Sequence, residues 1–124
     1  MKKKERATVV CTRKNSVLLV SKDGLRWALP GGRPAKGEAA SDAAVRELCE
    51  ETGLKAKGLT LQFQFIGATT VHHVFVASFG KAAKPKPNNE IAYCQWFTSE
   101  AVVSITASPT TKVIVQSILA HQQT

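Results

Sequence analysis

Residues Gly32 to Leu54 read GRPAKGEAASDAAVRELCEETGL, and this stretch holds most of the acidic side chains of a basic chain. Five of the nine acidic residues fall between Glu38 and Glu51, although the formal net charge of the 124 residues is +8. A helix over residues 39–52, with about 100° of rotation per residue, would sort its side chains onto two faces. The carboxylate face would carry Glu47, Glu50 and Glu51 with the small Ala43 and Ala44, and the packing face would carry Val45, Leu48, Cys49 and Thr52. We expect the alanines to leave room for a bulky ligand beside the carboxylates.

Carboxylates three and four residues apart on one helix repel each other, so this face costs stability until cations neutralise it. Mg2+ suits such a site, because it prefers oxygen ligands and is usually shared between a few carboxylates and the phosphates of a substrate. The neighbouring Arg46 offsets only part of the charge. The alternative is a solvated acidic helix face. Against it, Gly31 and Gly32 precede the helix, where they let a ligand approach the backbone, and Gly53 suits a left-handed helix end.

The same stretch matches the Nudix box, G-x5-E-x7-R-E-U-x-E-E-x-G-U with U an aliphatic residue, at every specified position. Nine fixed positions over 23 residues rarely agree by chance. The chain therefore resembles the Nudix hydrolases, which cleave a nucleoside diphosphate linked to another group, or a related pyrophosphate. The resemblance implies an α/β fold, the Nudix α/β/α sandwich around a mixed β-sheet, in a single domain over residues 1–124. It also implies an enzyme that acts on phosphoanhydride bonds with Mg2+ as cofactor, for which Mn2+ can substitute.

The resemblance assigns a role to most fixed residues of the motif. The metal ligands would be the carbonyl of Gly32 and the carboxylates of Glu47, Glu50 and Glu51. The catalytic residues would be Glu47 and Arg46. The structural residues would be Glu38 and Gly53. Glu47 would bind the metal or activate water, and Arg46 would orient Glu47. Glu38 would tie the loop to the helix by pairing with Arg46.

Candidates for the site also stand outside the motif. Many Nudix relatives use a further acid as a ligand or general base, and Glu90 resembles it because it precedes a strand ending in Trp96-Phe97. The alternative for Glu90 is an exposed loop-end charge. Seventeen Lys and Arg residues would draw in polyanions such as nucleotides, inositol polyphosphates or RNA. The candidate phosphate contacts are Arg26, Arg33, Lys36, Lys84 and Lys86, for which the alternative is solvated surface charge.

The rest of the chain alternates between strand and helix patterns. Strands are expected over residues 7–12, 17–21, 27–29, 60–66, 71–79 and 91–97, and helices over 99–104 and from Ser108-Pro109 onward. The first two strands read as a hairpin across Arg13-Lys14-Asn15, and residues 80–89 read as an exposed loop. His72 and His73 are adjacent on a strand, so they face opposite sides and cannot ligate one metal ion together.

Two classes of substrate stay open. One is a nucleoside triphosphate, including an oxidised one, as for a MutT-like pyrophosphohydrolase. The other is a diphosphoinositol polyphosphate or a diadenosine polyphosphate, which the basic charge and the similarity around residues 43–53 favour. A function of another class is a non-catalytic polyanion or RNA-binding module, which the intact acids disfavour. We expect a small polyphosphate as partner and no nucleic acid, with RNA carrying a 5′-triphosphate left open.

The distribution of apolar residues and the spacing of the cysteines predict where the protein is located and whether its thiols are reduced. No apolar run approaches the roughly 18 residues of a membrane span. The apolar segment after the basic start, Met1 to Arg6, is too short for a signal peptide. We therefore expect a cytoplasmic protein without a membrane partner. Cys11, Cys49 and Cys94 lack metal-ligand spacing and are expected to be reduced and buried. The oligomeric state cannot be derived from the sequence.

Overall fold

The computed structural model describes residues 2–122, so both ends of the expected domain, 1–124, lie outside the described residues. The strands are β1 (Lys4–Val10), β2 (Thr12–Arg13), β3 (Ser16–Ser21), β4 (Arg26–Trp27), β5 (Gly31–Gly32), β6 (Gly58–Ile66), β7 (Thr70–Ser78), β8 (Tyr93–Thr98) and β9 (Thr106–Ala107), and the helices are α1 (Ala40–Thr52), α2 (Ser99–Ser104) and α3 (Pro109–Gln122). Within this part of the chain, no helix combines the length and the apolar character that a bilayer crossing requires.

The strands form a mixed arrangement. The largest sheet has the order β5-β1-β7-β6, in which β1 and β7 run parallel while the other neighbours run antiparallel. A second sheet, β2-β3-β8, is antiparallel, and β4 pairs with β9 in parallel. The parallel register joins Lys4 to Thr70 and continues to Val10 and Val76.

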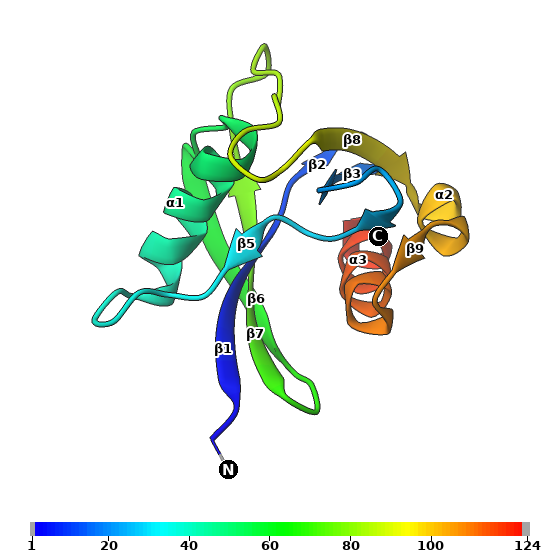
Figure 1. Cartoon of the computed structure of the whole chain (residues 1–124). Helices are drawn as coiled ribbons and strands as arrows, with labels where there is room; N and C mark the ends of the chain where they lie inside the picture. Colours follow the sequence, from blue (N-terminus) through cyan, green and yellow to red (C-terminus); the bar gives the residue numbers. More distant parts are fainter. Residues whose placement is uncertain (1, 123–124) are drawn as a thin grey trace.

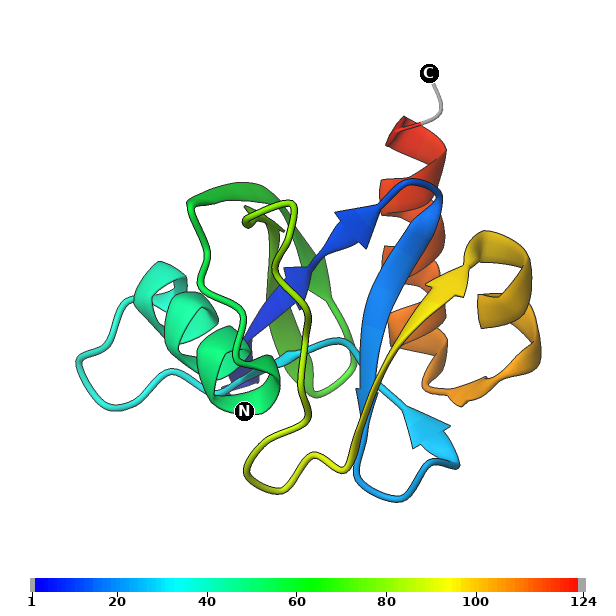
Figure 2. The same cartoon turned by 90° about the horizontal axis from the view of Figure 1, so that it is seen from above.

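Helices cover both faces of this sheet, with α1 on one side and α3 on the other (Figures 1 and 2). Two separate apolar cores confirm the layers. One core joins Val10 and Val74 to the buried face of α3, which carries Ile114, Val115, Ile118 and Leu119. The other joins Ala7, Val9 and Phe75 to α1. The α/β/α sandwich around a mixed sheet is therefore confirmed.

The expected hairpin across residues 13–15 is only partly right. A tight turn does join β2 to β3, and Lys14 adopts the left-handed conformation there with φ 56°. The longer strand before it, however, belongs to a different sheet, because β1 pairs with β5 and β7. Residues 7–12 show no break in sequence pattern, so the separation depends on partners far away in the chain.

Helix α1 corrects one expectation from its sequence pattern. Ala43 and Ala44 are fully buried against the sheet, whereas Val45 is 41% exposed. The small side chains let α1 pack closely on β1, so they do not leave space beside the carboxylates. At the end of the helix, Gly53 takes the expected left-handed conformation with φ 73°, and its N–H donates to the carbonyl of Cys49 at 2.8 Å.

Candidate active site

The two glycines of β5 are fixed by close approach of other groups. Gly31 has φ 147°, and a Cβ atom at this residue would lie 2.1 Å from the carbonyl oxygen of Ala7 on β1. At Gly32, a Cβ atom would lie 2.6 Å from the carboxyl carbon of Glu47. The carboxylate of Glu47 therefore rests directly against the backbone of the strand that precedes α1.

Arg46 holds three carboxylates around one guanidinium group. Its Nε and Nη2 each donate to Glu38 at 3.0 Å, and its Nη1 donates to Glu47 at 2.9 Å and to both oxygens of Glu50 at 3.3 Å. Hydrogen bonds from Arg46 and from the N–H of Ala35 lower the pKa of Glu38 to about 2. Glu38 thus joins the loop to the helix through Arg46, and the same arginine fixes the position of Glu47.

Glu51 lies deeper than the other acids and has a different electrostatic environment. Burial, together with the charge of Glu47, raises its pKa to about 7, against the hydrogen bond that Oε1 accepts from Gly31 N–H at 2.9 Å. The positive charge of Arg6 of β1 lowers the pKa of Glu51. Burial lowers the pKa of Arg6, while Glu51 and Glu47 oppose this shift. Glu47, which Arg46 partly neutralises, and Glu51 therefore lie near the half-buried Arg6.

Glu47 and Glu51 face a pocket of about 530 Å³, which we call the acidic pocket. Its charged lining residues are Arg6, Lys22, Asp23, Arg26, Glu47, Glu51 and Glu90. Glu90 stands at the exposed rim, where its Oε2 lies 3.1 Å from Nζ of Lys22. Carboxylates and cations thus line one cavity, an arrangement that can bind phosphate groups next to metal-ligating oxygens.

The structure brings some of the expected site residues together and separates others. Gly32, Glu47, Glu51, Glu90 and Arg26 all line the acidic pocket, whereas Glu50 is absent from its lining and is held by Arg46. Arg33 and Lys36 line a different pocket. Lys84 and Lys86 are exposed and line neither pocket. Their loop is nevertheless attached to α1, since the N–H groups of Lys86 and Asn88 donate to the carbonyls of Thr52 and Glu51.

Two cations of the acidic pocket, Arg6 and Lys22, were not identified from the sequence. Arg6 stands in a run of basic residues that resembles solvated charge, and only the pairing of β1 with β5 and β7 brings it to the acids. The sequence indicates only that Arg6 shares a face of the strand with Thr8, two residues further along. The two histidines do face opposite sides: Nδ1 of His72 lies 2.9 Å from Oγ1 of Thr8, and Nε2 of His73 lies 2.7 Å from Glu5.

The donor atoms of this site fit a hard divalent cation. They are the carboxylates of Glu47, Glu50 and Glu51 and the backbone carbonyl of Gly32, which are all oxygen ligands of the kind that Mg2+ prefers. Within residues 2–122, however, no three His, Cys, Asp or Glu side chains stand in a ready metal-binding arrangement. Arg46 accounts for this at Glu50, because the guanidinium occupies both carboxylate oxygens.

Comparisons with known proteins find relatives of this chain. The family model for the NUDIX domain matches residues 2–118. A Mycobacterium tuberculosis protein named "Putative 8-oxo-dGTP diphosphatase 3" is 31% identical over 73% of this chain and 46% of its own length. A Mus musculus protein named "Oxidized purine nucleoside triphosphate hydrolase" is 31% identical over 62% of this chain and 52% of its own length. The chain spans about half the length of these curated relatives.

Solved structures show the same fold. A "putative nudix hydrolase family member" from Chromobacterium violaceum superposes with a TM-score of 0.84 and 28% identity, over 94% of this chain and 77% of that one. The MutT structure described for Aliivibrio salmonicida and Vibrio cholerae superposes with a TM-score of 0.79 and 18% identity, over 97% and 98% of the two chains. The sandwich, with a glycine-rich strand that runs into an acidic helix, places the chain in the Nudix class of folds. This chain belongs to the NUDIX domain family.

Proposed function

We propose that this protein hydrolyses a phosphoanhydride bond in a nucleoside triphosphate, including an oxidised one, with Mg2+ as cofactor. The observation that carries the proposal is the pair of Glu47 and Glu51 beside Arg6 in the acidic pocket. Two carboxylates that repel each other in a partly buried place suit a cation bound with a polyanion. The names of the M. tuberculosis and mouse relatives support a nucleotide substrate.

The positively and negatively charged side chains of the acidic pocket would have different roles. Arg6 and Arg26, with Lys22 at the rim, would bind the phosphate groups. Glu47, Glu50, Glu51 and the carbonyl of Gly32 would hold Mg2+, which when bound screens the phosphate charge and lowers the pKa of a bound water. Arg46 would act as a positioning residue, because its hydrogen bond fixes the carboxylate of Glu47.

The reaction forms one bond from a water oxygen to phosphorus and breaks one bridging P–O bond. The leaving phosphate keeps the electron pair of the broken bond, and the proton of the water passes to a carboxylate of the pocket. Glu47 and Glu90, which both line the acidic pocket, are the two candidates for this base that the family resemblance offers. Glu50 would have to leave Arg46 in order to ligate the metal.

A magnesium-dependent product-release screen tests the proposal. The panel contains nucleoside triphosphates, 8-oxo-dGTP, diadenosine polyphosphates, a diphosphoinositol polyphosphate and RNA with a 5′-triphosphate. We expect turnover of nucleoside triphosphates, loss of activity with excess chelator, and a fall in kcat/KM of about a thousandfold in Glu51→Gln with an unchanged circular dichroism spectrum. Full activity in chelator would remove the metal mechanism, and saturable binding without turnover of any compound would favour a binding module.

The role of Glu90 is tested by Glu90→Gln. A base or ligand acts in the transition state, so its loss should lower kcat and kcat/KM together, by about a hundredfold. Lys22→Ala separates the ion pair from the carboxylate, because it removes the partner of Glu90 and keeps Glu90 itself; as a phosphate contact its loss should raise KM and leave kcat near wild type. Wild-type kcat in Glu90→Gln would leave Glu90 as an exposed rim charge and Glu47 as the remaining base.

A further inference from the structure

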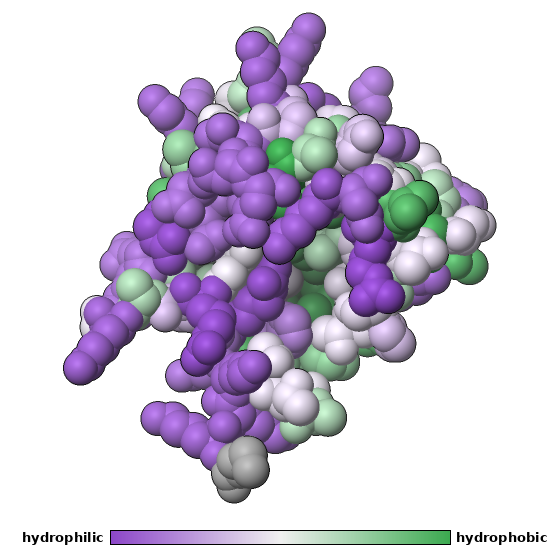
Figure 3. All heavy atoms as spheres, viewed as in Figure 1, coloured by the Kyte–Doolittle hydropathy of each residue, from purple (hydrophilic) through white to green (hydrophobic). Residues whose placement is uncertain are grey.

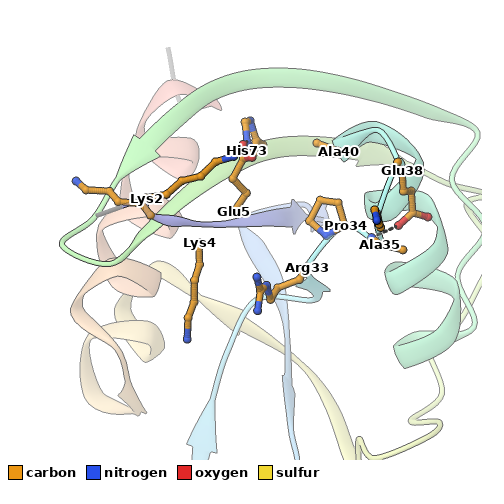
Figure 4. A pocket seen from close by; sticks show the side chains of 12 residues that line it. Lys2, Lys4, Glu5, Arg33, Pro34, Ala35, Glu38, Ala40 and His73 are labelled. Atoms are coloured by element: carbon orange, nitrogen blue, oxygen red, sulfur yellow. Dashed lines mark hydrogen bonds and ion pairs between the residues drawn. The ribbon is translucent and has the colours of Figure 1, made fainter.

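A second pocket, of about 610 Å³, lies beside the N-terminal end of β1. Five basic side chains line it, namely Lys2, Lys3, Lys4, Arg33 and Lys36, and we call it the basic pocket. It shares no lining residue with the acidic pocket. Figure 4 shows Lys4 and Arg33 on one side of β1, with Glu5 and His73 on the other. Hydrophilic side chains gather over this end of the molecule (Figure 3).

The two acidic side chains of the basic pocket are already engaged within the protein. Glu38 accepts two hydrogen bonds from Arg46 and one from the N–H of Ala35. Glu5 pairs with Nε2 of His73 at 2.7 Å. The cations are left without such partners: among residues 2–122, no ion pair is formed by Lys2, Lys4, Arg33 or Lys36. The basic pocket therefore carries positive charge that the protein itself does not neutralise.

The shape and chemistry of the basic pocket select among possible anions. Lys4 and Arg33 project on the same side of β1 (Figure 4), and like charges held close together cost free energy, which an anion with several negative charges recovers. Arginine binds phosphate through two parallel hydrogen bonds, and lysine binds it as a point charge. Among the lining residues there is no Phe, Tyr or Trp, and the imidazole of His73 is already held by Glu5, so the pocket offers a nucleobase no free ring on which to stack. The basic pocket is thus suited to phosphate groups and not to bases.

We propose that the basic pocket is a second anion site, separate from the acidic pocket, which binds compact ligands that carry several phosphate groups. Arg33 and Lys36, which the sequence placed with the hydrolysed substrate, contribute to this second site. The cations lie on two segments, the start of the chain and the loop before α1, so the ligand bridges them. Binding there requires neither Mg2+ nor hydrolysis, so it stands or falls independently of the proposed activity.

The test uses inorganic tripolyphosphate as the probe and the whole chain with excess chelator, followed by nuclear magnetic resonance. We expect amide shifts at residues 3–5, at Arg33 and at residues 35–38, with saturation, and a weaker affinity as salt increases. Shifts confined to Gly31, Gly32 and the end of α1 would place the anion in the acidic pocket and overturn the proposal. An absence of binding would overturn it as well.

Two matched triple variants distinguish a defined binding site from a general effect of positive charge. Lys4→Ala/Arg33→Ala/Lys36→Ala should raise the Kd of tripolyphosphate about tenfold, the order expected when three exposed charge contacts are lost. Lys55→Ala/Lys57→Ala/Lys81→Ala removes the same charge from exposed positions that line neither of the two pockets, and it should change the Kd less than twofold. Equal losses in both variants would show a diffuse charge effect. A 5′-triphosphorylated oligonucleotide that binds while tripolyphosphate does not would make the ligand a nucleic acid and overturn the proposal.

Discussion

Gly32 and Gly37 stand on either side of the short loop before α1, and they are glycines for different reasons. At Gly32 an added Cβ atom would meet the carboxyl group of Glu47, whereas at Gly37, with φ 79°, it would meet no atom within 4 Å. The first glycine therefore leaves space for a functional side chain. The second provides a left-handed turn.

Gly32→Ala should separate activity from stability. The carboxyl group of Glu47 is the far end of a flexible side chain, so it can move away and leave the fold intact. We expect kcat to fall about a hundredfold, because small displacements of reacting groups have effects of this order. Kinetics and urea unfolding measure the two effects. The control, Gly37→Ala, should keep kcat and lose about 1 kcal/mol of unfolding free energy through backbone strain. Equal kcat values in the two variants would contradict this account of Gly32.

Glu51 should make the metal-free protein less stable as pH rises. Its pKa in the folded protein is about 7, above the ordinary value of 4.5, so between these values the folded state holds a proton that the unfolded chain has released. The stabilising contribution is therefore complete below pH 4.5 and is lost as pH rises through about 7. After allowance for partial solvent exposure, the expected loss is about 1–2 kcal/mol.

Urea unfolding in chelator at several pH values measures this loss. Glu51→Gln should remove most of the decline between pH 4.5 and 7 and should be at least as stable as wild type at pH 7. A Glu51→Gln variant that is much less stable at pH 7 would show that the carboxylate is a structural group.

At the scale of elements, α1 depends on the small size of its buried alanines. Ala44→Leu should lower the unfolding free energy by about 1–3 kcal/mol, since the added atoms have no space between the helix and the sheet. Val45→Leu is the matched control at the next position, where the side chain is 41% exposed, and it should change stability by less than 0.5 kcal/mol. Urea unfolding distinguishes the two. Equal effects would mean that α1 packs with a different face.

The elements also show what local sequence can predict. The motif placed Glu38, Arg46 and Glu47 in one segment, so their mutual contacts follow from helix periodicity and one loop. The acidic pocket needs Arg6 as well, and that residue arrives only through pairing between distant strands. Arg33 lies next to Gly32 in the chain, yet Arg33 lines the basic pocket and Gly32 lines the acidic pocket. The path of the loop backbone determines which pocket each residue lines. A local sequence pattern predicts which residues share a face of a helix or strand, whereas long-range strand pairing determines which of these faces come into contact.

For the whole molecule, Mg2+ should act as a stabilising ligand. A ligand that binds only the folded state at one hundred times its Kd contributes about 2.7 kcal/mol, which corresponds to a rise in Tm of about 10 °C for a chain of this size. Thermal unfolding with and without Mg2+ measures it. Glu50→Gln/Glu51→Gln should melt at the same temperature under both conditions. A full rise in that double variant would place the cation elsewhere.

The parallel pairing of β1 with β7 also affects how the protein is made. The first strand leaves the ribosome before α1, β6 and β7 exist, so the edge of β1 that pairs with β7 stays open until then. Contacts between such distant segments form slowly, because a long loop must close first. The antiparallel neighbours β6 and β7 can pair early, whereas β1 must wait. Synthesis therefore passes through a stage in which one edge of an apolar strand is open to aggregation.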